Sequence, residues 1–213
     1  MNALLLCVIA LISYISGCFN TPVFACRFFY KRPLRSFGRG QEGFKKLFRE
    51  ESWLGILKIY LPDAVKIILT VLIGGWILGA RGYAETGKIF ALFCLEMGRM
   101  FPATHRFVGT LGIKELIIGM FIVNSIAGFM TLIVFAAAIA LWRYMALAGV
   151  IAGFISILAV FVFVEAPSGV MIMAVVAVLI FFRNFNQLDR IRKHRAKKLT
   201  LKEDLSYKFD KSF

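Results

Sequence analysis

Long uncharged runs alternate with short charged segments along this chain. Residues 3–26 carry no charge over 24 positions, and as a helix they would measure about 36 Å, more than the roughly 30 Å hydrocarbon core of a bilayer. Residues 59–80 and the shorter run 89–101 hold only a few charges, and residues 144–164 and 166–182 hold none. The pattern predicts an all-α polytopic membrane protein.

The uncharged run 116–142 decides how many spans the chain has. A single crossing there would leave residues 183–213, with ten Lys and Arg, outside the cell, where basic segments are disfavoured. A break near Asn124, Ser125 and Gly128 makes two short crossings and returns the tail to the cytoplasm. Each half has only about 17 residues, the lower limit for spanning, so a shallow or re-entrant pair between five full spans is an alternative.

The positive charges then set the orientation. No Lys or Arg precedes residues 3–26, whereas Arg27, Lys31 and Arg32 follow them closely, which favours an external N-terminus. We therefore expect about seven transmembrane helices with the N-terminus outside and the C-terminus cytoplasmic. Residues 1–182 would form a single helical membrane domain with cytoplasmic loops at 27–58 and 104–114, and residues 183–213 a basic cytoplasmic tail.

Composition supports the membrane interpretation. The chain is 60% hydrophobic and 18% charged, which excludes an ordinary water-soluble enzyme. Its 26 Lys and Arg against 12 Asp and Glu give a net charge of +14, but these cations stand between apolar runs, so membrane insertion explains them better than a nucleic-acid partner. The four cysteines lie in or beside apolar runs without a CxxC motif, and neither a disulfide framework nor a metal site or cofactor is expected.

Two predicted spans contain charges at membrane depth, where they are costly and usually paired or functional. Asp63 with Lys66, and Glu96 with Arg99, place opposite charges three residues apart on one helical face. Each pair could neutralise itself near the interface and orient its helix. Alternatively, these faces could line a polar cavity open to the cytoplasm.

The first basic segment has a composition suited to phosphate. Residues 36–49 interleave three glycines with Lys and Arg, and backbone N–H groups and guanidinium forks both complement phosphate oxygens. Residues 106–112 repeat this mixture less strongly. A basic loop between spans can equally be no more than a determinant of topology.

Several segments together carry a family resemblance: residues 14–21, 38–49, 63–66, 98–102, 106–112 and 183–187. In this order they resemble the motifs of the bacterial membrane glycerol-3-phosphate acyltransferases that use acyl phosphate as donor, the PlsY type. Three glycines and Arg49 match the first loop motif of that family, and Asp63 with Lys66 matches its Asp-x-x-Lys. The seven-span, N-out and C-in topology of the family agrees with the orientation predicted from charge.

The resemblance implies an O-acyltransferase of the bacterial plasma (inner) membrane. It would move a fatty acyl group from acyl phosphate to glycerol 3-phosphate, giving 1-acylglycerol 3-phosphate for phospholipid synthesis, within the lipid bilayer. Substrate-binding positions implied by the matching segments are Gly38, Gly40, Gln41, Gly43, Lys45, Lys46, Arg49, Asp63, Lys66, Arg99, Arg106, Gly109, Gly112 and Arg183. Catalytic motif positions of the family fall on Arg39, Asn184 and Gln187, where the family has Ser, His and Asn.

These replacements keep other functions open. Asparagine does not exchange a proton near neutral pH, so Asn184 favours a noncatalytic relative that binds a lipid phosphate and regulates or scaffolds the pathway. A small membrane transporter is a third interpretation, in which the charges inside the spans form the path. The two halves of the chain show no internal repeat, which counts against it.

Overall fold

The structure, a computed structural model, describes residues 3–31, 40–105, 109, 112–164 and 166–193, and for residues 40–53 only the path of the helix. Within these ranges the regular structure is entirely helical, as predicted. The helices are α1 (Ala3–Cys18), α2 (Thr21–Tyr30), α3 (Gly40–Gly79), α4 (Ala84–Met100), the 3-10 turn η2 (Ala103–His105), α5 (Ile113–Val123), α6 (Ser125–Trp142), α7 (Met145–Phe163) and α8 (Pro167–Arg192).

The first predicted span is two helices and not one. α1 and α2 meet at a 45° bend, and Pro22 stands in the first turn of α2. Proline has no N–H to donate to the preceding turn, so it starts a helix readily but interrupts one. The uncharged run 3–26, predicted as one span, is therefore bent between two helices, and the bent pair together is long and apolar enough for one span.

α3 is much longer than the predicted span 59–80. Its 40 residues begin at Gly40, so most of the described part of the segment 27–58, predicted as a loop, is helical. Gln, Glu, Lys and Leu predominate in residues 41–51, and these residues favour helix. Gly40 and Gly43 therefore lie in the first turn of a helix and not in a flexible glycine loop.

The predicted break in the long run 116–142 is confirmed at Asn124. Its backbone is extended, and its side-chain oxygen accepts hydrogen bonds from the N–H groups of Ile126 (2.9 Å) and Ala127 (3.2 Å). This is an N-cap for α6. α5 before the break has 11 residues, or about 16 Å of helix, which is shorter than the roughly 30 Å hydrocarbon core of a bilayer.

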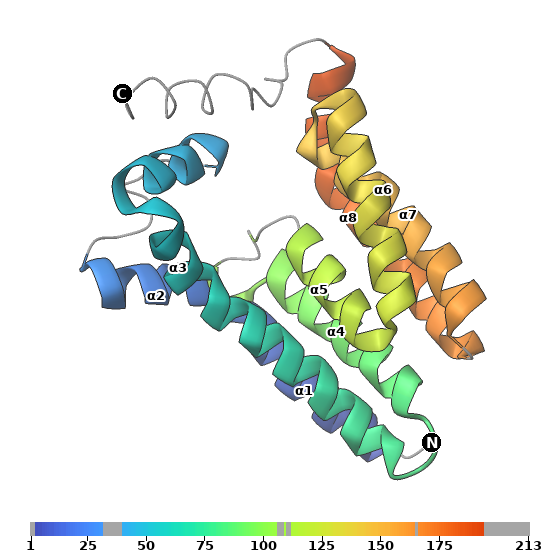
Figure 1. The fold of residues 1–213 in the computed structure, drawn as a ribbon. Helices are drawn as coiled ribbons and strands as arrows, with labels where there is room; N and C mark the ends of the chain where they lie inside the picture. Colours follow the sequence, from blue (N-terminus) through green and yellow to red (C-terminus); the bar gives the residue numbers. More distant parts are fainter. Residues whose placement is uncertain (1–2, 32–39, 106–108, 110–111, 165, 194–213) are drawn as a thin grey trace.

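The helices form two groups (Figure 1): α1, α3 and α4 pack together, α6, α7 and α8 pack together, and α5 lies between the groups. Among the described residues, α6, α7 and α8 are each long and apolar enough to cross a membrane, and the α1–α2 pair is a fourth candidate if it counts as one span. Outward-facing side chains are strongly apolar, for example Trp76, Phe161 and Phe182. This is the surface of a membrane protein.

α1 and α4 cross with their backbones in contact. A Cβ at Gly98 would lie 2.2 Å from the Tyr14 carbonyl oxygen, and a Cβ at Gly17 would lie 2.2 Å from that of Leu95. Only glycine permits such an approach, as in many membrane helix pairs. The crossing holds the end of α1 against the end of α4, where most of the buried charges lie.

Candidate functional site

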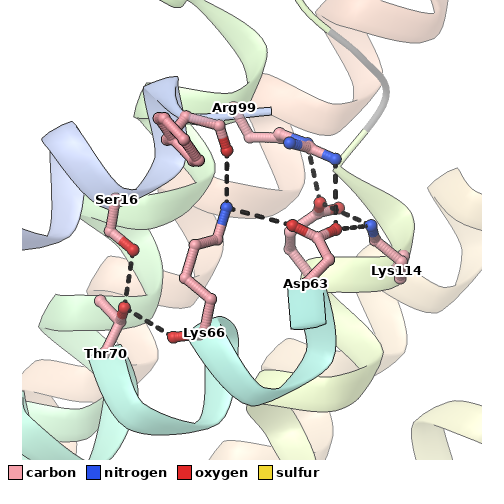
Figure 2. Close-up of polar contacts among 8 residues, drawn as sticks. Ser16, Asp63, Lys66, Thr70, Arg99 and Lys114 are labelled. Atoms are coloured by element: carbon pink, nitrogen blue, oxygen red, sulfur yellow. Dashed lines mark hydrogen bonds and ion pairs between the residues drawn. The ribbon is translucent and has the colours of Figure 1, made fainter. Parts of the chain in front are cut away.

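Asp63 of α3 is the centre of a buried group of charges (Figure 2). Only 1% of its surface is exposed. One carboxylate oxygen lies 3.1 Å from the Lys66 ammonium, and the other lies 3.3 Å from the Arg99 guanidinium and also contacts the Lys114 ammonium. One carboxylate thus binds cations from three helices, α3, α4 and α5.

A second carboxylate completes the group. Glu115, in the first turn of α5, lies 2.8 Å from Nε of Arg99 and 3.5 Å from Nζ of Lys114. We call Asp63, Lys66, Arg99, Lys114 and Glu115 the charge cluster. It contains three cations and two carboxylates, so it keeps a surplus positive charge.

A hydrogen bond also links the charge cluster to the bend between α1 and α2. Lys66 donates a hydrogen bond of 2.7 Å to the carbonyl oxygen of Phe19, which lies in that bend. One turn further along α3, the hydroxyls of Thr70 and Ser16 lie 2.8 Å apart, and Thr70 also donates to the Lys66 carbonyl. Lys66 therefore adds a second donor to the Phe19 carbonyl oxygen, which also accepts from the N–H of Thr21 at 3.1 Å.

Arg183 of α8 binds the segment that joins α4 to α5. Its guanidinium donates to the Gly109 carbonyl oxygen at 2.6 Å and lies 5.9 Å from the centre of the Phe101 ring. The Phe101 carbonyl in turn accepts from the Tyr14 hydroxyl at 2.9 Å. A Cβ at Gly109 would lie 2.0 Å from the Arg99 carbonyl oxygen, so glycine is needed for this close packing.

The structure brings together several of the predicted site residues. Asp63 and Lys66 form the ion pair that their spacing predicted. The predicted pairing of Glu96 with Arg99 is wrong among the described residues, because Arg99 pairs with Asp63 and Glu115 on neighbouring helices. Gly112 forms the N-cap of α5 with a left-handed φ of 70°, a conformation that favours glycine.

Other predicted residues are not in the cluster. Asn184 is fully buried, and its amide donates to the Ile180 carbonyl of its own helix, whereas Gln187 is exposed. Backbone alone is described for the helical positions Gly40, Gln41, Gly43, Lys45, Lys46 and Arg49. Gly38, Arg39 and Arg106 lie outside the described residues.

Lys114 and Glu115 belong to the site although the sequence did not predict them there. They stand at the start of an apolar run, where a cation is expected merely to mark the end of a span. One feature of the sequence could have indicated their role: Lys114 and Glu115 are adjacent and follow directly after the glycine-bearing segment 106–112. Glu96 was noticed but given the wrong partner.

The chain is similar to known glycerol-3-phosphate acyltransferases. The family model described as glycerol-3-phosphate acyltransferase matches residues 7–194. A glycerol-3-phosphate acyltransferase of Thermoanaerobacter pseudethanolicus is 22% identical over 196 residues, covering 92% of this chain and 96% of that protein. One from Jannaschia sp. is 29% identical over 198 residues, covering 93% and 95%.

Solved structures with a similar fold include two crystal structures of PlsY, an integral membrane glycerol 3-phosphate acyltransferase. The glycerol 3-phosphate form superposes with a TM-score of 0.73 and the lysophosphatidic acid form with 0.74. In both, 19% of residues are identical, and the match covers 94% of this chain and 98% of the other. This likeness establishes the helical fold.

We expect Asp63→Asn to destabilise the protein strongly. Removing the carboxylate charge leaves Lys66, Arg99 and Lys114 close together with only Glu115 to neutralise them, and breaking a buried ion group of this kind costs about 3–5 kcal/mol. Thermal unfolding of the purified protein in detergent measures the change. The control is Glu85→Gln on α4, which breaks a pair with Lys88 whose side chains are 42% and 21% exposed and should cost at most about 1 kcal/mol. Equal losses in the two variants would contradict the central place of Asp63.

Proposed function

The chain belongs to the glycerol-3-phosphate acyltransferase family, and we propose that it transfers a fatty acyl group from acyl phosphate to glycerol 3-phosphate, forming 1-acylglycerol 3-phosphate for phospholipid synthesis. The observation that carries this proposal is the extent of the family match. It runs from within α1 to just beyond α8, so it involves the whole helical fold and not one motif.

The charge cluster suits the two phosphorylated substrates. Its surplus positive charge favours an anion, and Lys66 and Lys114 are the members that solvent reaches, with side chains 20% and 33% exposed. Arg99 is 7% exposed and held between two carboxylates, so in this proposal it fixes α4 and α5 and does not itself hold phosphate. Acyl phosphate has a good leaving group, so positioning and electrostatic stabilisation can supply much of the rate enhancement.

A second set of cations would bind phosphate at the start of α3. Backbone N–H groups at a helix N-terminus bind anions, and the helical course of α3 from Gly40 supports this use of its first turn. In this proposal Gly38, Arg39, Gly40, Gln41, Gly43, Lys45, Lys46 and Arg49 form the anion cradle, and Arg106 and Arg183 flank it. The site residues Arg39, Asn184 and Gln187 would orient substrate, since none of them exchanges a proton readily near neutral pH.

We further propose that the chain crosses the bacterial plasma membrane seven times, with residues 1–182 as the membrane domain and residues 183–213 as its cytoplasmic tail. The start of α1 and the end of α8 lie at opposite ends of the bundle (Figure 1), as an odd number of passes requires. In this proposal α5, with 11 residues, is the shortest of the seven passes. The positive charge of the tail favours the cytoplasm.

Reporter fusions test this topology. A fusion after Gly82, in the turn between α3 and α4, should report an external position, and fusions after Arg143 and Lys193 should both report the cytoplasm. The reason is that cations favour the cytoplasmic side: Arg143 is the one charged residue in the sequence 116–164, and residues 183–213 hold ten Lys and Arg. Placement of Arg143 and Lys193 on opposite sides would contradict the seven-pass arrangement.

A direct assay tests the reaction. Purified protein given acyl phosphate and radiolabelled glycerol 3-phosphate should form labelled 1-acylglycerol 3-phosphate, and its gene should restore growth to a strain lacking its own acyltransferase. Binding of glycerol 3-phosphate without product would instead favour a noncatalytic lipid-phosphate-binding protein. Flux across reconstituted vesicles with neither binding nor product would favour a transporter.

Arg49→Ala should lower kcat/KM for glycerol 3-phosphate by at least about 100-fold, because a charged donor to the substrate phosphate is lost. The matched control is Cys7→Ala, which changes an exposed thiol on α1 and should alter kcat/KM by less than about twofold. Steady-state kinetics on the two proteins give the comparison. Equal effects would contradict the cradle assignment.

A further inference from the structure

α2 has an aromatic face that the rest of the described structure leaves uncovered. Phe24, Phe28 and Phe29 are 56%, 79% and 48% exposed. On the other side of the helix, Cys26 is buried against Ile59 of α3. α2 is therefore held to α3 along one side and exposes large apolar side chains along the other.

α2 begins where α1 reaches the end of the helical bundle. α1 has 16 residues and α4 has 17, and the two pack with Gly17 against Gly98, close to the last residue of each. α1 thus arrives at the same end as α4 without any contribution from α2. The chain then bends by 45°, and α2 lies beside α3 at this end of the bundle (Figure 1). In the topology proposed above this is the cytoplasmic end.

The lipid-facing side of α3 extends to the level of α2. Exposed apolar side chains recur every three or four residues along one face of the helix: Leu54, Leu57, Leu61, Val65, Leu69, Leu72 and Trp76. The part of this face near Trp76 lies within the membrane domain. Because the face continues without a polar break as far as Leu54, the surface suited to lipid includes the stretch of α3 that packs against α2.

Cations without carboxylates accompany these apolar faces. Arg27, Lys31 and Lys58 are exposed, and no ion pair between described residues includes any of the three. Neither residues 19–31 nor residues 54–62 contain Asp or Glu. Aromatic side chains next to unpaired Lys and Arg are typical of the depth at which lipid headgroups begin.

We propose that α2 and residues 54–62 of α3 form a docking surface for anionic phospholipid of the cytoplasmic leaflet. The phenylalanines of α2 insert beside the acyl chains, and the three cations bind headgroup phosphates, which long Lys and Arg side chains reach from an apolar helix surface. A free phosphate ion would fit the cations and leave the aromatic face exposed to water, so the two features together favour a lipid. Such a surface would exist whether or not the chain is an acyltransferase.

Quenching by labelled lipids tests this surface. A fluorophore is attached at Phe28→Cys in a Cys7→Ala background, in which the other cysteines are buried. In phosphatidylcholine vesicles, phosphatidylglycerol with a nitroxide near its headgroup should quench it at least about twofold more than phosphatidylcholine with the same label. At Phe161→Cys, which is 71% exposed in the uncharged stretch 144–164, phosphatidylglycerol should quench no more than phosphatidylcholine.

Replacing the three cations identifies their role. The triple variant Arg27→Gln, Lys31→Gln and Lys58→Gln should reduce the preference for phosphatidylglycerol at residue 28 to about one, because the attraction to the anionic headgroup is lost. Should this variant not fold, the same protein with all three cations in about 1 M NaCl must lose the preference, since salt screens charges at an exposed surface.

A second triple variant controls for net charge. It removes three exposed cations from elsewhere and should keep the preference at residue 28: Arg81→Gln, Arg192→Gln and Lys193→Gln. Equal quenching of residue 28 by the two lipids, or equal loss of the preference in both triple variants, would overturn the proposal. Loss of the preference in inorganic phosphate, at an ionic strength where NaCl leaves it unchanged, would overturn it in favour of a soluble anion. Shielding of residue 28 from both lipids would indicate that a polypeptide covers α2 instead.

Discussion

The attraction between Asp63 and three cations organises the part of this protein that carries its chemistry. One carboxylate of α3 contacts Lys66 on its own helix, Arg99 on α4 and Lys114 on α5. In a chain of 60% hydrophobic residues, few other interactions can hold polar side chains at depth, because each unpaired charge there is expensive. The three helices therefore share one fixed arrangement at this end of the bundle.

Backbone contacts extend this arrangement to the rest of the fold. The crossing of α1 and α4 at Gly17 and Gly98 brings the α1–α2 bend to Lys66. Arg183 of α8 donates a hydrogen bond to the Gly109 carbonyl oxygen, which joins α8 to the segment between α4 and α5. Segments far apart in the chain thus meet beside one polar site, while the outer surface stays apolar enough for lipid.

Local signals in the sequence predicted the features that depend on neighbouring residues. The Asn124 break and the Asp63–Lys66 pair follow from a capping residue and from helical spacing. Pro22 also signals the bend between α1 and α2. The bend was not predicted, because residues 3–26 form one long uncharged run. The ion-pair partners of Arg99 could not be predicted from the sequence. Glu96 lies on the same helix, whereas the actual partners, Asp63 on α3 and Glu115 on α5, come close only through the packing of the helices.

The proposed site has two sets of cations. Arg49 and the other cations of the first segment are assigned by their match to a motif, whereas the charge cluster is assigned by contacts. The two sets differ in physical role as well. The cluster fixes helices through paired charges, and the cradle would bind a phosphate through charges that stay available.

A double-mutant cycle between Asp63 and Lys114 tests whether the charge cluster joins α3 to α5. Asp63→Asn, Lys114→Met and the double variant would each be compared with the unaltered protein by thermal unfolding in detergent. If the two side chains form a buried ion pair that joins α3 to α5, the losses should be non-additive, with a coupling energy of about 1–3 kcal/mol. Losses that add to within about 0.5 kcal/mol would contradict a charge cluster centred on Asp63.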